Sequence, residues 1–203
     1  MLTQSHSGNQ VPDVRGAGDL FTVVEEPGRL AAAPFAQAVE HGKWEIGRGA
    51  ALSEPPVFAL SPSIAVDFMS QVKPPVEKAL ASDQPQTAVD AFFHVIDPSF
   101  WDHAPDERKE IYRANLPAML TDLQQPLYQL TTADLGKIYR PCLMMYGSTS
   151  IKWFIEIAKI VAGAIPNCRL VEIAGAGHAT YAARPVEFAA AVRDFALSLP
   201  AVK

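Results

Sequence analysis

Among the residues whose types suit catalysis, His178 has the most specific surroundings. It stands in the run Ile173–Ala179 (IAGAGHA), and the residues before it, Arg169–Ile173 (RLVEI), predict a strand. Open α/β sheets place their sites at the carboxyl ends of strands. An imidazole held there can take a proton from a nucleophile and pass it to a leaving group. The other histidines lack this context, and we interpret them as solvated surface groups: His6, His41, His94 and His103.

Motifs for other chemistries do not occur in the sequence. No glycine-rich phosphate loop follows a predicted strand, and neither H-E-x-x-H nor C-x-x-C is found. Cys142 lies within an apolar run and is interpreted as a small hydrophobe, and no residue near Cys168 suggests an activated thiolate. We therefore expect neither a cofactor nor a metal ion.

Length and composition favour a soluble globular domain. The chain has 203 residues, of which 49% are hydrophobic and 19% charged, so it can bury a sizeable core. Its net charge of -5 and its scattered Lys and Arg residues argue against nucleic acid or a membrane as a partner. No apolar run approaches the roughly 20 residues that span a bilayer. With two cysteines and no secretory signal pattern, the sequence predicts a cytoplasmic protein.

The elements that must position His178 alternate in the last third of the chain. Pro141–Tyr146 (PCLMMY) is a continuous apolar run, typical of a strand buried on both faces, and Arg169–Ile173 predicts a second strand. Helical patterns follow these strands, over Ile151–Ala164 and Pro185–Leu199. This rhythm predicts an α/β fold with a mostly parallel sheet and flanking helices.

Residues 63–125 instead predict a cluster of short helices without strands. The apolar spacing favours helices over 63–82, interrupted at Pro74-Pro75, over 87–96 and over 105–123.

The first 50 residues have a different character. Met1–Asp19 is rich in small and polar residues and is interpreted as a flexible arm. Leu20–Glu25 (LFTVVE) predicts a short strand, and Arg29–His41 predicts a helix that Pro34 either kinks or starts. These two elements are candidates to replace one strand–helix unit.

Taken in order, the landmarks after residue 50 resemble the C-terminal part of an α/β-hydrolase. The resemblance over Leu135–Leu197 rests on Pro141-Cys-Leu143, Tyr146-Gly147, Ala164-Ile-Pro-Asn167, Ile173–Ala179, Arg184–Phe188 and Val192-x-x-Phe195. It extends back to about Ala51, because Ser53-Glu54-Pro55-Pro56 is similar to the end of the strand that precedes the lid in this family.

This resemblance implies a partial α/β-hydrolase-like fold with a helical lid. The hydrolase-like domain would span 51–203, about three quarters of the chain, with the lid over 63–125 and strand–helix units over 135–199. Residues 1–50 would form a segment of unclear homology.

The resemblance also implies roles for two residues at strand ends. His178 would be the catalytic base, which needs an acid to orient it. The family commonly carries an Asp after the strand that ends at Tyr146, but this turn reads Gly147-Ser148-Thr149-Ser150. Some hydrolases of this fold supply the acid just after the strand before the lid, where Glu54 stands. We therefore expect Glu54 to orient His178.

The nucleophile does not follow from the sequence. The family's elbow is G-x-S-x-G, expected before the strand that ends at Glu54. Residues 1–53 contain no such motif, no version with Asp or Cys at its centre, and no supported oxyanion motif of the His-Gly type. Ser148 is the remaining hydroxyl candidate, because the turns that carry Ser148 and His178 are neighbours in this fold.

Two functions from different classes remain open. In the first, the chain is an enzyme that hydrolyses a small hydrophobic ester or related acyl substrate; the family also contains dehalogenases, epoxide hydrolases and C–C bond hydrolases. In the second, it is a truncated or frameshifted, non-catalytic relative that binds a ligand or another chain. A sheet that keeps three or four of the usual eight strands has an exposed edge, so the second interpretation predicts a homodimer through that edge.

Overall fold

The centre of the fold is a parallel sheet in the computed structural model, which describes residues 20–23, 49–124 and 129–200. Its strands are β1 (Leu20–Val23), β2 (Gly49–Ser53), β3 (Cys142–Gly147) and β4 (Cys168–Ile173). They lie in the order β1-β2-β3-β4, and every neighbouring pair is parallel. The predicted α/β class with a parallel sheet is therefore confirmed.

One strand of this sheet comes from the first 50 residues. β1 lies within the predicted strand Leu20–Glu25 and pairs with β2, with Leu20 beside Gly49 and Val23 beside Leu52. The N-terminal segment thus contributes to the same sheet as the C-terminal strands. The predicted arm 1–19 and the predicted helix 29–41 lie outside the described residues.

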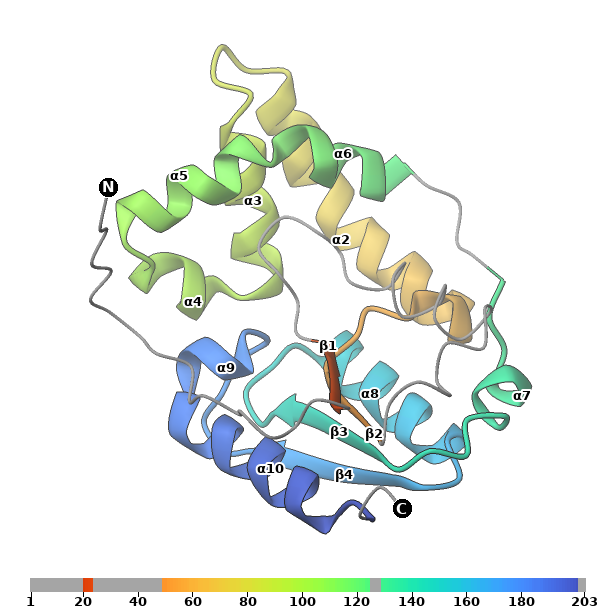
Figure 1. Cartoon of the computed structure of the whole chain (residues 1–203). Coiled ribbons are helices and arrows are strands. Elements are labelled where there is room, and N and C mark those ends of the chain that lie inside the picture. The colour runs from red at the N-terminus through yellow and green to blue at the C-terminus, as the bar shows by residue number, and fades with distance from the viewer. Residues whose placement is uncertain (1–19, 24–48, 125–128, 201–203) are drawn as a thin grey trace, which may run out of the picture.

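Side chains of the central strands alternate between two hydrophobic cores. The helices of the half that contains the sheet are α7 (Thr132–Leu135), α8 (Lys152–Ala164), α9 (Thr180–Ala183) and α10 (Pro185–Ser198). Leu52 and Met144 pack in the core that includes α8, whereas Leu143 and Met145 pack in the core that includes α10. The two helices accordingly lie on opposite faces of the sheet (Figure 1). Because both faces are covered, β2 and β3 carry continuous apolar runs instead of an alternating pattern.

A second group of helices lies above the sheet (Figure 1). This helical layer consists of α2 (Pro62–Leu80), α3 (Thr87–Ile96), α4 (Pro98–His103), α5 (Asp106–Ala114) and α6 (Leu116–Gln124), and a single 3₁₀ turn, η2 (Phe58–Leu60), precedes it. The stretch 105–123 is predicted as one helix, but it forms two helices, α5 and α6. Pro117 has no N–H to donate to the carbonyl of Arg113, so α5 ends at Ala114 and α6 begins after Asn115.

Helix α2 also differs from its prediction, because it is continuous where a break is expected. The sequence predicts an interruption at Pro74-Pro75, whereas α2 runs through both prolines. The missing N–H groups leave the carbonyls of Ser70 and Gln71 without their usual donors. Both residues are exposed, so water can reach those carbonyls, while the buried Val72 packs in the core. Burial of the apolar face therefore outweighs the local preference of proline.

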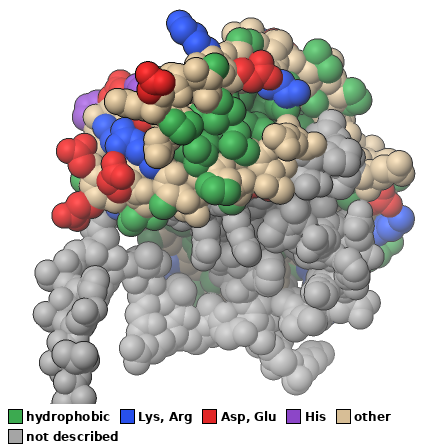
Figure 2. Space-filling view, turned by 90° about the horizontal axis from the view of Figure 1, so that it is seen from above, with side chains coloured by type: hydrophobic (Ala, Val, Ile, Leu, Met, Phe, Trp, Pro, Cys, Tyr) green, Lys and Arg blue, Asp and Glu red, His purple; other side chains and the backbone are tan. Residues whose placement is uncertain are grey.

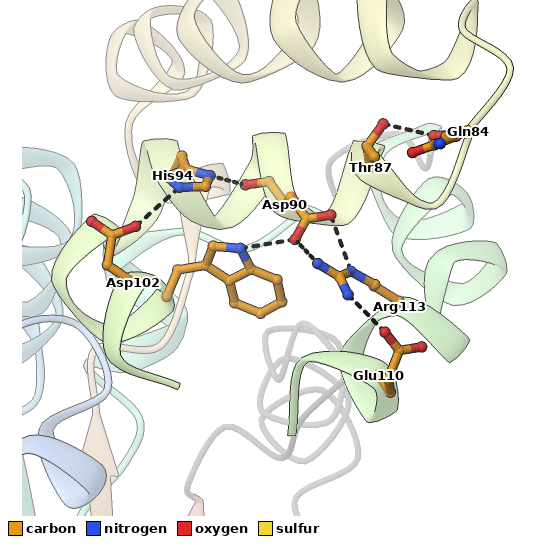
Figure 3. Close-up of polar contacts among 8 residues, drawn as sticks. Gln84, Thr87, Asp90, His94, Asp102, Glu110 and Arg113 are labelled. Carbon is orange, nitrogen blue, oxygen red and sulfur yellow. Dashed lines mark hydrogen bonds and ion pairs between the residues drawn. The ribbon is translucent and has the colours of Figure 1, made fainter. Parts of the chain in front are cut away.

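Polar side chains join three helices of the layer (Figure 3). Arg113 of α5 donates to both carboxylate oxygens of Asp90 in α3, at 2.6 and 3.1 Å, and to Glu110 at 2.7 Å. The indole N–H of Trp101 in α4 donates to the same Asp90 carboxylate at 3.0 Å. The hydrogen bonds to Asp90 and then to Glu110 raise the pKa of Arg113 above its ordinary value. Asp90 is thus the acceptor that α4 and α5 share.

Asp67 connects the layer to the sheet half of the molecule. Its carboxylate accepts from Trp153 Nε1 at 2.7 Å and pairs with Lys152 Nζ at 2.8 Å, both at the start of α8. The hydrogen bonds from Lys152 and then from Trp153 hold the pKa of Asp67 below its usual range. Across the described helices, none combines the length and the apolar character needed to cross a membrane.

Candidate functional site

The predicted pair of Glu54 and His178 meets at the carboxyl ends of β2 and β4. His178 Nδ1 lies 2.6 Å from Glu54 Oε2, Glu54 is fully buried, and His178 is 7% exposed. An ionised carboxylate only accepts hydrogen bonds, so the proton of the neutral ring is assigned to Nδ1 and its lone pair to Nε2. This tautomer is the one that a general base acting through Nε2 requires.

Glu54 reaches this position through an unusual backbone conformation. Its φ of 41° lies in the left-handed region, which costs a residue other than glycine about 1–2 kcal/mol. The following Pro55 adds to the cost, because a residue before proline prefers an extended conformation. The Glu54 N–H donates to the carbonyl of Met145 at 3.1 Å and so extends the pairing of β2 with β3. Strained residues of this kind are frequent at functional sites.

Two further donors hold the Glu54 carboxylate. The backbone N–H of Gly147 donates to Oε1 at 2.7 Å, and the hydroxyl of Ser150 donates to Oε2 at 2.6 Å. With His178, three donors satisfy a carboxylate that has lost its contact with water. No motif in the sequence marks Ser150 as a partner of Glu54. The available signal was its place in the turn where the family commonly carries Asp.

The turn after β3 and the turn after β4 are hydrogen-bonded to each other. Thr149 N–H donates to the carbonyl of Ala176 at 2.9 Å, and the amide of Gly175 donates to Ser148 Oγ at 2.8 Å. A Cβ at Gly147 would collide with the carbonyl oxygens of the facing turn, so this close approach requires glycine. The structure therefore places Ser148 beside the turn that precedes His178, with its hydroxyl oxygen bonded to Gly175.

Apolar and polar neighbours both fix the histidine ring and its loop. The ring of Phe154 in α8 stacks on the imidazole, with centroids 3.8 Å apart and an angle of 16° between the planes. Two residues on, Thr180 shares a 2.7 Å hydrogen bond with Ser53 at the end of β2, and both hydroxyls are in the interior. Neither contact followed from the sequence, since Phe154 and Ser53 are far from His178 along the chain.

The helical layer reaches the same loop through Asp97, which lies between α3 and α4. The carboxylate of Asp97 accepts a hydrogen bond from the backbone N–H of Ala179 at 3.1 Å. Within the described ranges, no group of three or more His, Cys, Asp or Glu side chains is arranged to hold a metal ion. The contact of His178 with the Glu54 carboxylate suits proton transfer at the imidazole, and both the sheet and the layer contribute to the position of the ring.

Comparison with known proteins relates the whole arrangement to solved structures. No family model and no curated protein matches the sequence. An esterase from a Rhodococcus species superposes with a TM-score of 0.63 at 14% identity, over 89% of this chain and 66% of that one. An alpha/beta hydrolase from Sphaerobacter thermophilus gives 0.55 at 22% identity, over 94% and 76%. A bromoperoxidase from Bacillus anthracis gives 0.58 at 17% identity, over 87% and 66%.

These likenesses establish the fold alone, since identities this low do not carry a function from one protein to another. The chain spans about two thirds of the length of the Rhodococcus and Bacillus proteins.

Proposed function

We propose that this chain, whose fold is that of the α/β-hydrolases, hydrolyses a small hydrophobic ester or related acyl compound with His178 as general base. The observation that carries the proposal is the 2.6 Å hydrogen bond between His178 Nδ1 and the buried Glu54 carboxylate. The name of the Rhodococcus relative, an esterase, supports this class of substrate.

Water is the nucleophile in this proposal. Residues 24–48, which connect β1 to β2, contain no Ser, Thr or Cys, so this connection supplies neither a hydroxyl nor a thiol. His178 Nε2 would take one proton from a water molecule as the water oxygen adds to the substrate carbonyl. The tetrahedral intermediate then expels the alkoxide, which receives that proton from His178. The products are the carboxylic acid and the alcohol, and the imidazole returns to its neutral form.

Glu54 and the helical layer have separate tasks in this mechanism. Glu54 keeps the proton on Nδ1 and stabilises the imidazolium that forms when Nε2 is protonated. We assign the helical layer the role of a lid that limits the access of bulk water. Its contact with the loop of His178 through Asp97 supports this assignment.

Hydrolysis of p-nitrophenyl acetate and p-nitrophenyl butyrate tests the proposal. We expect turnover above the buffer rate, lowered at least about 100-fold by His178→Ala, because general base catalysis contributes on this scale. Glu54→Gln should cause a loss of similar size, because the amide N–H₂ turns Nδ1 into an acceptor and moves the ring proton to Nε2.

A matched histidine serves as the control. His103 is exposed in α4 and bonds through Nδ1 to the carbonyl of Ser99, so His103→Ala should leave the rate within about twofold. Equal activity of His178→Ala and the unsubstituted chain would remove His178 from the mechanism. Labelling of a serine by a fluorophosphonate, with matching loss of activity, would show that a serine and not water is the nucleophile. The variants Ser148→Ala and Ser150→Ala would then identify that serine.

A second candidate function is ligand binding without turnover. The absence of Ser, Thr and Cys from residues 24–48 favours it, since the family's usual nucleophile has no substitute there. In that case short-chain esters should raise the melting temperature of the protein while the hydrolysis rate stays at the buffer value.

A further inference from the structure

We propose that Asp97 is a positioning residue that fixes the loop of His178 to the helical layer. The effect of Asp97 on catalysis rests on the proposed function, whereas its hydrogen bond to the loop can be measured without any activity. Asp97 ends α3 and precedes α4, so it belongs to the layer, whereas His178 belongs to the sheet half of the molecule.

The two oxygens of the Asp97 carboxylate serve different elements. Oδ1 accepts from the backbone N–H of Phe100 at 3.0 Å and so caps the start of α4. Oδ2 accepts from the backbone N–H of Ala179 at 3.1 Å. Asp97 is 7% exposed, so the second bond forms away from solvent, where an unsatisfied amide is costly.

Gly177, the residue before His178, also packs directly against the Asp97 carboxylate. A Cβ at Gly177 would lie 2.7 Å from Asp97 Oδ2 and 2.8 Å from Oδ1, closer than real contacts allow. Asp97 thus touches the residue before His178 and the residue after it. The absence of a side chain at Gly177 is what lets the carboxylate come this close.

Capping of α4 alone does not explain this arrangement. A serine hydroxyl satisfies an N-cap about as well as a carboxylate oxygen does. The cap therefore needs one oxygen only, and the second carboxylate oxygen of Asp97 is not required for it. Thr180 ties the same loop to the sheet through Ser53, and Asp97 ties it to the layer. His178 is therefore held relative to both halves of the molecule, and a displacement of the layer acts on the histidine through one carboxylate.

The variant Asp97→Ser separates the two hydrogen bonds. The serine hydroxyl can still cap Phe100, but it is too short to reach Ala179. We expect native-state hydrogen exchange of the Ala179 amide to become at least about tenfold faster, while the Phe100 amide stays within about twofold. The long-range ¹⁵N–¹H spectrum of the His178 ring should change as well. Unchanged exchange at Ala179 and an unchanged ring spectrum would overturn the proposal.

A double-mutant cycle tests the contact from the loop side. Gly177→Ala should disturb the His178 ring signals in the unsubstituted chain and disturb them much less in the Asp97→Ser background, where the clashing oxygens are gone. Equal effects of Gly177→Ala in both backgrounds would contradict a contact through the carboxylate. If Asp97→Ser does not fold, Asp97→Asn replaces it, because the amide keeps the shape and one of the two acceptors.

Kinetics then link the contact to catalysis. We expect Asp97→Ser to lower kcat about tenfold with KM within about threefold, because the loop still forms but holds His178 less accurately. An unchanged kcat would contradict the positioning role. If no variant and no unsubstituted chain hydrolyses the esters, the proposed function fails, and the exchange and ring spectra still decide whether Asp97 holds the loop.

Discussion

Glu54 is satisfied by three donors from two separate segments of the chain. Gly147 and Ser150 come from the turn after β3, and His178 comes from the loop after β4. Hydrogen bonds to an ionised group are roughly twice as strong as those between neutral groups, which offsets part of the cost of burying the carboxylate. The carboxylate that contacts His178 therefore follows β2, and a neutral hydroxyl occupies the turn after β3.

Removal of the Ser150 hydroxyl tests this account of Glu54. We expect Ser150→Ala to lower the free energy of unfolding by about 1.5 kcal/mol, because one hydrogen bond to a buried carboxylate is lost. Urea denaturation followed by circular dichroism measures the change. Ser70→Ala is the control, since that exposed hydroxyl donates to the carbonyl of Asp67 and accepts from Gln71 Nε2 at the surface, and its effect should stay within about 0.5 kcal/mol. Hydrolysis by Ser150→Ala should persist; a loss as complete as that of His178→Ala would make Ser150 the nucleophile.

The two cysteines give a pH-dependent prediction. Burial raises the pKa of Cys142 from 9.0 to about 12 and that of Cys168 from 9.0 to about 11. Raised values mean that folding disfavours the thiolate, by about a thousandfold for Cys142 and about a hundredfold for Cys168. Stability from these thiols is therefore complete below pH 9 and is lost as the pH rises above it.

Alkylation by iodoacetamide measures this shift. In the native protein at pH 8, both thiols should react far more slowly than in guanidinium chloride, and Cys168 should react before Cys142. Variants with a single cysteine, Cys142→Ser and Cys168→Ser, assign each rate. Labelling of native Cys142 at the rate of a free peptide thiol would show that β3 is not the closed inner strand described above.

At the scale of elements, the helical layer depends on a shared acceptor as much as on its aromatic side chains. The ring of Phe93 stacks on Trp101, with centroids 4.6 Å apart, and both pack against Tyr112 of α5. The indole N–H of Trp101 nonetheless needs an acceptor in this interior position, and Asp90 provides it while pairing with Arg113 (Figure 3). A short helix such as α4 is not stable alone, so these contacts hold it in the layer.

The variant Asp90→Ala should weaken the layer. It leaves the Trp101 indole without its acceptor and the Arg113 guanidinium with Glu110 but without Asp90, so we expect the free energy of unfolding to fall by about 2 kcal/mol. Asp102→Ala is the matched control, because Asp102 is 59% exposed and pairs with the exposed His94, and its effect should be below about 0.5 kcal/mol. Chemical denaturation compares the two. Equal midpoints for both variants would mean that the layer does not need the shared acceptor.

At the scale of the whole molecule, the described sheet has two edges, β1 and β4. Arg169 and Glu172 are exposed on β4, and Leu170 between them is 39% exposed. On the opposite side of the molecule, seen from above, hydrophobic side chains gather within the described part of the surface, and charged side chains lie toward its outer rim (Figure 2). Unpaired edges and apolar surface both favour association.

We therefore propose that the chain forms a homodimer through an edge of the sheet. Light scattering coupled to size-exclusion chromatography should give about twice the chain mass of 22.0 kDa. The variant Leu170→Lys tests the β4 edge: loss of the dimer assigns β4, and an unchanged dimer excludes it. A monomer at every concentration tested would contradict the proposal.

The sequence by itself determined the class of the fold and pointed to His178 as a candidate base. The apolar run that became β3 and the Gly-Ala-Gly-His turn after β4 are local patterns, and strand period and turn chemistry act over a few residues. The expected helices of the layer were recognised by the same spacing. At Pro74 and Pro75, however, local preference lost to the burial of α2, a free energy that no short window contains.

Only the tertiary structure decided which side chains meet. Glu54 and His178 are 124 residues apart, and their contact depends on the parallel order of β2, β3 and β4, which brings the carboxyl ends of these strands to one edge. Ser150, Phe154 and Asp97 reach the site from other parts of the chain, and nothing in the sequence around Phe154 and Asp97 marks them. Hydrogen bonds and ring contacts depend on positions in space, so the fold has to form before these residues become a site.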